Sequence, residues 1–205
     1  MRNMTINEFA KIVASESPVP GGGSIAALCG ALSAALSEMV ANLTVGKKKY
    51  AECKEEMTEI INEASLLREK LLNYIEEDSL AYNKVVQAYK LPKESEEEKV
   101  FRILKIEEGL KIAASVPLKV AETSFEIFPL VEAVVKRGNK SSVTDALVGA
   151  MMARTGVLSA LLNIRINLDS IKDDEFVKEL KAKADFLENE TNTYEKKILE
   201  LSPFK

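Results

Sequence analysis

Apolar residues recur along most of the chain at intervals of three and four, the spacing typical of amphipathic helices. The clearest stripe lies between about residues 48 and 89, where Leu67, Leu71 and Ile75 share one helical face. No alternation of apolar and polar residues typical of a strand extends beyond a few positions. The pattern therefore predicts an all-α fold, with residues 1–205 forming a single-domain bundle of long antiparallel helices.

Caps and helix breakers indicate where the predicted helices begin and end. Thr5 and Glu8 have the spacing of a capping box, and so have Ser95 and Glu98. Gly46 and Pro92 each interrupt the helical pattern. We expect helices over about residues 5–14, 24–44, 48–89, 95–125, 141–167 and 173–201, with a kink at Pro117 and a short further helix from Pro129.

The segments 24–44 and 141–167 are unusually rich in small residues. Ala27 and Ala31, with Gly30 beside them, form a face that lets another helix backbone approach closely. We expect one of these helices to pack across the axis of a dimer. The first segment is apolar, but Ser, Glu and Asn residues interrupt it and most of its apolar residues are Ala. It is therefore expected to be a buried bundle helix rather than a membrane span.

The segment Ser17–Ser24, of sequence SPVPGGGS, is a candidate binding loop. After Pro20, the glycines Gly21, Gly22 and Gly23 remove every Cβ from the loop, and Ser24 is expected to N-cap the helix that follows. A loop of this kind before a helix presents free N–H groups to a carboxylate, a phosphate or the polar edge of a heterocycle. A tight turn between two helices explains the same residues equally well.

Asp78 is the candidate catalytic residue. It lies inside a predicted helix, four residues after Tyr74 and four before Tyr82, so that all three share the apolar face. Burial raises the pKa of a carboxyl group, which suits a general acid and base near neutral pH. The alternative is a structural aspartate that accepts a hydrogen bond from a tyrosine hydroxyl or from a neighbouring helix end.

Three further polar residues are candidates for substrate binding. Asn163 and Asn167 are four residues apart on an apolar helix, and an amide matches the donor and acceptor edge of a heterocycle. Hydrogen bonding between helices is the alternative role for this pair. Lys47 follows Gly46 at a helix boundary, where it can meet an anionic substrate tail or belong to a solvated cluster.

The composition narrows the range of ligands, metal sites and cellular locations that the chain is expected to have. The formal net charge of −4 disfavours nucleic-acid binding. The chain has no His and only two Cys, and it shows no metal-ligand spacing, so we expect no metal site. The N-terminus lacks a basic region followed by an apolar run, which predicts a cytoplasmic protein. Abundant Lys and Glu, with a single Gln, resemble the composition of thermophilic proteins.

Six strings in order resemble the cyclodeaminase/cyclohydrolase family of folate enzymes. The resemblance extends from about Thr5 to Ile171, and beyond that point the match is only to a generic charged helix. They are SPVPGGGS, LTVGKKKY, DSLAYNKVVQAYKLPK, EGLKIAASVPLKVAE, RGNKSSVTDA and NIRINL. The resemblance implies an all-α homodimer whose substrate is a tetrahydrofolate derivative, with or without a polyglutamate tail. It places the family's catalytic aspartate on Asp78.

The resemblance also implies the reaction. We expect conversion of 5-formiminotetrahydrofolate to 5,10-methenyltetrahydrofolate plus ammonia. The alternative within the family is hydrolysis of 5,10-methenyltetrahydrofolate to 10-formyltetrahydrofolate. The glycine loop, Lys47, Tyr82, Asn163 and Asn167 are expected to bind substrate, and neither reaction requires a metal or redox cofactor. A non-catalytic helical dimer that binds a ligand is the alternative from another class.

Overall fold

Helices make up every regular element in the part of the chain that the computed structural model describes, which is residue 1 and residues 3–204. The predicted all-α fold is therefore confirmed. The elements are α1 (Ile6–Val13), α2 (Gly22–Asn42), the 3₁₀ helix η1 (Lys48–Cys53), α3 (Lys54–Tyr89), α4 (Glu96–Phe125), α5 (Phe128–Arg137), the 3₁₀ helix η2 (Lys140–Ser142), α6 (Val143–Leu168) and α7 (Asp174–Leu199).

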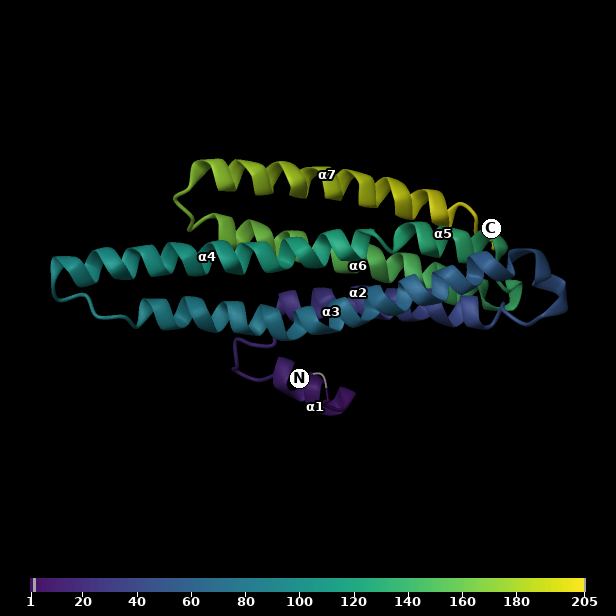
Figure 1. The fold of residues 1–205 in the computed structure, drawn as a ribbon, viewed down its shortest axis with the longest axis horizontal. Coiled ribbons are helices and arrows are strands. Elements are labelled where there is room, and N and C mark those ends of the chain that lie inside the picture. The colour runs from purple at the N-terminus through teal and green to yellow at the C-terminus, as the bar shows by residue number, and fades with distance from the viewer. Residues whose placement is uncertain (2, 205) are drawn as a thin grey trace.

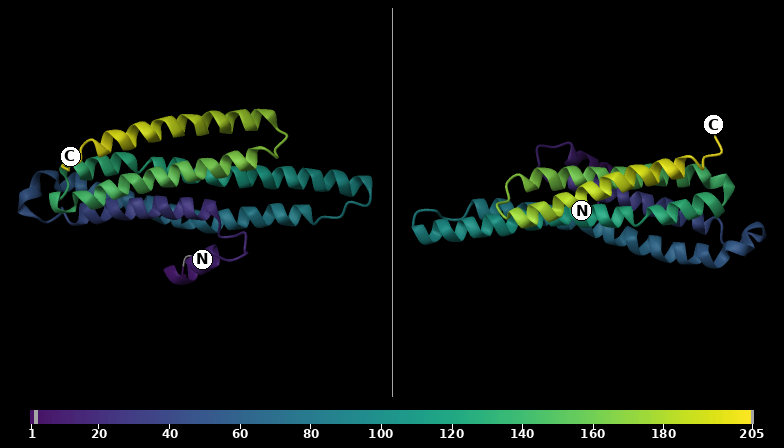
Figure 2. Two further views of the ribbon diagram at one scale, coloured as in Figure 1. Left: turned by 180° about the vertical axis from the view of Figure 1, so that it is seen from behind. Right: turned by 90° about the horizontal axis from the view of Figure 1, so that it is seen from above.

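The long helices form layers. α3 and α4 lie side by side as a long hairpin, and α2 and α6 pack against this hairpin from behind (Figure 1). Seen from the back of the molecule, α2 and α6 run next to one another in front of the hairpin (Figure 2). α7 covers the outer edge of α6, and α1, none of whose residues is buried, stands apart from the bundle (Figure 1).

The predicted caps form as the sequence indicates. The backbone N–H of Glu8 donates to the Thr5 hydroxyl at 3.2 Å, and that of Glu98 donates to the Ser95 hydroxyl at 3.1 Å. Each glutamate carboxylate in turn accepts a hydrogen bond from the backbone N–H of its cap residue, which completes both capping boxes. α4 continues as one helix through Pro117.

Two helix starts differ from the prediction. α2 begins at Gly22, two residues early, so Gly21 is the N-cap and Ser24 lies within the first turn. The prediction that Ser24 is the N-cap is therefore wrong. Its hydroxyl instead donates a hydrogen bond to the Asp78 side chain. The long helix expected from residue 48 begins instead as η1, because Tyr50 has the non-helical angles φ −117° and ψ 23°.

α2, α4 and α6 cross at a point without room for larger side chains. A Cβ on Gly156 of α6 would lie 3.0 Å from the Gly30 backbone nitrogen and 3.0 Å from the Ser124 hydroxyl. A Cβ on Gly30 would lie only 2.3 Å from that same hydroxyl. The small-residue faces that the sequence shows thus allow close packing, and their crossing fixes the position of α2 relative to α6.

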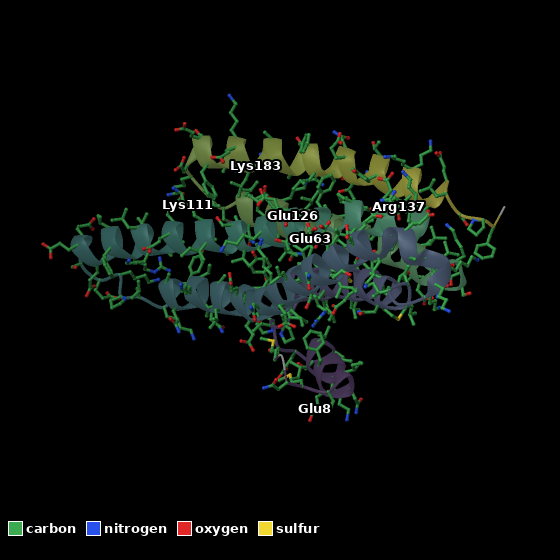
Figure 3. All side chains as sticks on the ribbon, turned by 45° about the vertical axis from the view of Figure 1, so that its right-hand side comes forward. Glu8, Glu63, Lys111, Glu126, Arg137 and Lys183 are labelled. Carbon is green, nitrogen blue, oxygen red and sulfur yellow. The ribbon has the colours of Figure 1, made fainter. Side chains whose placement is uncertain are left out.

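Ion pairs tie the ends of several helices together at the surface. Lys111 of α4 pairs with Asp173, which precedes α7, at 2.6 Å, and Arg137 of α5 pairs with Glu56 of α3. Figure 3 labels both cations among the side chains that project from the bundle. Exposed pairs of this kind each contribute at most about 1 kcal/mol, so the apolar core dominates stability.

Two helical segments, Gly22–Asn42 and Lys140–Leu168, are long and apolar enough to span a membrane. About half of each apolar window is buried inside the bundle, 56% and 50% respectively. The buried half of α2 packs on neighbouring helices, as expected for a bundle helix. The other half of each segment faces outward.

Substituting Gly156 by Ala should destabilise the bundle. The new methyl group meets backbone atoms of α2, which cannot rotate away, so the unfolding free energy should fall by about 1 to 3 kcal/mol. Urea denaturation measures this. Gly149→Ala in the same helix is the matched control, because its Cβ would have no neighbour closer than 3.7 Å. An equal loss in both variants would contradict the packing argument.

Candidate active site

A cavity of about 290 Å³ lies where the N-terminal turn of α2 meets α3, α4 and the C-terminal part of α6. The loop before α2, which contains a cis peptide bond between Val19 and Pro20, closes one side of it. Four elements that are distant in sequence therefore supply its walls. The lining residues are Pro18, Val19, Gly21, Gly22, Gly23, Asp78, Ala81, Tyr82, Val85, Leu110, Ala113, Asn163, Ile166 and Asn167.

Asp78 of α3 is the one acidic residue in this lining. The hydroxyl of Ser24 donates a hydrogen bond to Asp78 Oδ2 at 2.8 Å, and Ser24 itself is fully buried. The Ser24 backbone N–H, one of the free donors in the first turn of α2, also bonds to this carboxyl. Asp78 thus caps the N-terminus of α2 from a neighbouring helix.

Gly23 leaves the space that the Asp78 carboxyl occupies. A Cβ at Gly23 would lie 2.2 Å from Asp78 Oδ1 and less than 3.0 Å from the other two carboxyl atoms. Any other residue at this position would push the carboxyl aside. The glycine is needed for close approach rather than for a special backbone angle, because its φ is not positive.

Burial raises the pKa of Asp78 above its ordinary value. The loss of hydration is the largest cause, and the two hydrogen bonds from Ser24 act in the opposite direction because they stabilise the charged form. The carboxyl therefore keeps its proton to a higher pH than an exposed aspartate. It is a stronger base when ionised, as proton transfer near neutral pH requires.

Both asparagines line the cavity and are anchored to backbone carbonyls. Asn163 Nδ2 donates to the oxygen of Ser159, one turn earlier in α6, at 2.8 Å. Asn167 Nδ2 donates across to the oxygen of Ala113 in α4, also at 2.8 Å. Within the described residues, neither amide oxygen has a hydrogen-bond partner. Each asparagine therefore has a structural bond and an acceptor that is still available.

The structure brings most of the predicted site residues together, but not all of them. Gly21, Gly22, Gly23, Asp78, Tyr82, Asn163 and Asn167 line the cavity. Pro20 is buried beside the cavity without lining it, and Ser24 reaches it only through Asp78. Lys47 lies beyond the other end of α2, which spans about 30 Å at 1.5 Å per residue, so it does not line the cavity of its own chain.

Sequence reasoning missed the apolar walls. Val85, Leu110, Ala113 and Ile166 carry no chemical signature, and only the packing of α3, α4 and α6 places them at the cavity. It also missed the bond between Ser24 and Asp78, which are 54 residues apart. In the described part of the chain, no group of three or more His, Cys, Asp or Glu residues has the arrangement of a metal site.

Comparisons with known proteins identify the family of this chain. A sequence model of the formiminotransferase-cyclodeaminase family matches residues 5–186. The chain belongs to the formiminotransferase-cyclodeaminase family. A methenyltetrahydrofolate cyclohydrolase of Methylorubrum extorquens is 41% identical over 86% of this chain and 85% of its own length. This family membership confirms the resemblance seen in the six strings.

Other relatives differ in length and in the activity for which they are named. The rat formimidoyltransferase-cyclodeaminase is 34% identical over 92% of this chain, but the match spans only 35% of the rat protein. The crystal structure of a formiminotetrahydrofolate cyclodeaminase from Thermotoga maritima has the same fold, with a TM-score of 0.86. It is 31% identical, and the superposition covers 97% of this chain and 96% of the other. These relatives are all named as enzymes.

Asp78→Asn should stabilise the folded chain at neutral pH. Because the folded pKa lies above that of the unfolded chain, the stability contribution of Asp78 is full at low pH and is lost as pH rises through the folded pKa. Asn carries no charge at any pH, so its advantage over wild type should grow between pH 4 and pH 8. Urea unfolding at several pH values measures the difference.

Asp169→Asn is the matched control for that measurement, because it removes the same charge from an exposed position at the end of α6. The change in unfolding free energy of this variant reports the effect of net charge alone. A stability gain for Asp78→Asn that is equal at pH 4 and pH 8 would show that burial of the charge is not the cause.

Proposed function

We propose that this protein is a folate enzyme that transfers protons at the one-carbon bridge of tetrahydrofolate, with Asp78 as the acid and base. The observation that carries the proposal is the partly buried Asp78 carboxyl, of raised pKa, in a cavity with two asparagine amides. The family supports the substrate class, because both the cyclohydrolase and the cyclodeaminase relatives are named for reactions of folates.

The proposed reaction is the ring closure of 5-formiminotetrahydrofolate. N10 attacks the carbon of the formimino group, whose imino nitrogen is protonated, and ionised Asp78 takes the proton that N10 loses. Asp78 then gives this proton to the former imine nitrogen, the carbon–nitrogen bond breaks, and ammonia leaves. The cationic substrate becomes cationic 5,10-methenyltetrahydrofolate, so charge and protons balance with no cofactor. Holding N10 beside the carbon supplies the rest of the rate enhancement.

The other residues of the site bind and position the substrate in this proposal. The free amide oxygens of Asn163 and Asn167 accept hydrogen bonds from the N–H groups of the pterin ring. Tyr82 and the apolar residues pack against the ring faces, and the glycines let the ring approach the loop backbone. The cavity is at the small end of ligand pockets, so it holds the ring while the rest of the folate extends beyond it.

A second candidate reaction is the hydrolysis of 5,10-methenyltetrahydrofolate. It is favoured by the 41% identity to the cyclohydrolase, a relative that this chain matches over most of its length. The same carboxylate would take a proton from the attacking water. Both reactions share methenyltetrahydrofolate, as the product of one and the substrate of the other, so one site geometry serves either.

An absorbance assay at the methenyltetrahydrofolate band separates the two reactions. Appearance of the band from 5-formiminotetrahydrofolate identifies the cyclodeaminase, and enzyme-dependent loss of the band identifies the cyclohydrolase. Asp78→Asn should lower kcat at least about 100-fold for the active substrate, because it removes the proton-transfer group while the neutral amide keeps the shape. Substrate binding, measured by calorimetry, should persist.

The control for Asp78→Asn is Asp169→Asn, which should retain wild-type turnover because it lies outside the cavity. Near-wild-type turnover by Asp78→Asn would rule out the assignment. Binding of folates without turnover by the wild-type chain would indicate the non-catalytic alternative instead.

Gly23→Ala should also lower kcat, although Gly23 has no reactive group. The added methyl group displaces the Asp78 carboxyl from the Ser24 hydroxyl, and a misplaced acid and base loses about 10- to 100-fold in turnover. The fold should persist, because the contacted atoms belong to a side chain that can rotate. Gly149→Ala is the matched control, and similar kcat in both variants would contradict the proposed geometry.

A further inference from the structure

The first turn of α2 contacts two polar groups of the site, which come from two different helices. Successive residues of a helix point about 100° apart. Gly22 faces Asn163 of α6, where an added Cβ would lie 3.3 Å from Nδ2 and 3.4 Å from Oδ1. Gly23, the next residue, faces the Asp78 carboxyl of α3 instead. The turn therefore touches both polar groups, through different residues.

Ser24, the third residue of this turn, holds one oxygen of Asp78. Its hydroxyl donates to Oδ2 at 2.8 Å, and no other side chain among the described residues donates to this carboxyl. Oδ1 lies on the side of Gly23, where an added Cβ would come within 2.2 Å of it. Because Gly23 lines the cavity, Oδ1 is the oxygen that remains for a substrate.

The hydroxyl of Ser24 bonds chiefly to the carboxyl. The other acceptor within its reach is the Ile75 carbonyl oxygen, at 3.4 Å, which is a much weaker contact. Ser24 is fully buried, so bulk water does not compete for Oδ2. An ionised acceptor makes this hydrogen bond stronger than one between neutral groups. Loss of the hydroxyl should therefore change the ionised state of Asp78 most.

The amide of Asn163 is held in a similar way. Its Nδ2 donates to the Ser159 carbonyl oxygen at 2.8 Å, which anchors the side chain to its own helix. Gly22 leaves room for this anchored position, because an added methyl group would press on both the nitrogen and the oxygen of the amide. The amide could then yield only by moving away from the Ser159 carbonyl.

We propose that the first turn of α2 positions the two polar groups separately: Ser24 fixes Oδ2 of Asp78 so that Oδ1 takes and gives the proton, and Gly22 fixes the amide of Asn163 for the ring. This inference rests on the proposed folate reaction. There, N10 and the leaving nitrogen are bonded to the same carbon, so one fixed oxygen can serve both proton transfers. Ser24 and Gly22 are thus positioning residues, which act through Asp78 and Asn163.

The pH dependence of Ser24→Ala tests the first half. Removing a hydrogen bond that favours the ionised form should raise the pKa of Asp78 further. The acidic limb of kcat/KM, where activity appears as Asp78 loses its proton, should move to higher pH by about one pH unit, a tenfold change in the ionisation constant. The loss should be about tenfold on the limb and small above it. An equal loss at every pH would indicate a structural defect and overturn the proposal.

Ser33→Ala is the matched control for this pH profile. Ser33 belongs to the same helix and is also fully buried, but its hydroxyl donates to the Gly149 carbonyl oxygen, at 2.7 Å. The variant removes a buried hydroxyl without touching Asp78, so the acidic limb should stay at its wild-type pH. An equal displacement of the limb in both variants would contradict the role of Ser24.

Gly22→Ala tests the second half. It should raise KM about threefold to tenfold and leave kcat within about twofold of wild type, whereas Gly23→Ala lowers kcat. Asn163→Ala removes the amide that the new methyl group meets. Adding Gly22→Ala to Asn163→Ala should therefore change KM by less than about twofold. A full further rise in KM would show that Gly22 does not act through Asn163, and would overturn this part.

A titration of Asp78 without substrate separates this inference from the proposed function. The chain has six aspartates, and in protein labelled with ¹³C-aspartate the carboxyl signal that Asp78→Asn lacks belongs to Asp78. Its pKa should rise by about one pH unit in Ser24→Ala and stay unchanged in Ser33→Ala. An unchanged pKa in Ser24→Ala would overturn the proposal. A raised pKa in a chain without folate turnover would reject the proposed function alone.

Discussion

The contact between the Asp78 carboxyl and the first turn of α2 is the constraint on which the site depends. The carboxyl accepts hydrogen bonds from the hydroxyl and backbone N–H of Ser24, in space that exists only because residue 23 has no Cβ. The free N–H groups of a helix start favour a negative charge, while burial disfavours it. The second effect is larger, so the pKa of Asp78 is raised and the group can both give and take a proton.

The close crossing of α2 and α6 holds this contact in place. Gly30 and Gly156 let the two backbones approach to a distance that no larger residue permits. Since α2 presents Gly23 and Ser24, which contact the Asp78 carboxyl, while α6 presents Asn163 and Asn167, the crossing sets the separation between that carboxyl and the amides. Small residues in the core thus affect the geometry of the site without touching it, because they set the positions of whole helices.

The sequence predicted the helical architecture well because helix signals are local. The capping boxes at Thr5 and Ser95 and the apolar stripe of α3 depend on residues three or four apart. The errors occurred where tertiary contacts compete with local signals. Ser24 has the preferred chemistry of an N-cap, yet the helix begins earlier because Asp78 supplies the cap from α3. Tyr50 likewise departs from helical angles although its segment favours a helix.

The sequence by itself determined the family, the helices and the residues Asp78, Asn163 and Asn167, because ordered motifs and periodicity are properties of the chain. The tertiary structure decided which of these residues meet, since contacts such as that of Ser24 with Asp78 join positions 54 residues apart. It also decided that Lys47 is separated from the cavity of its own chain. A linear pattern records which groups are present but not the distances between helices, and those distances are set by how closely the small-residue faces pack.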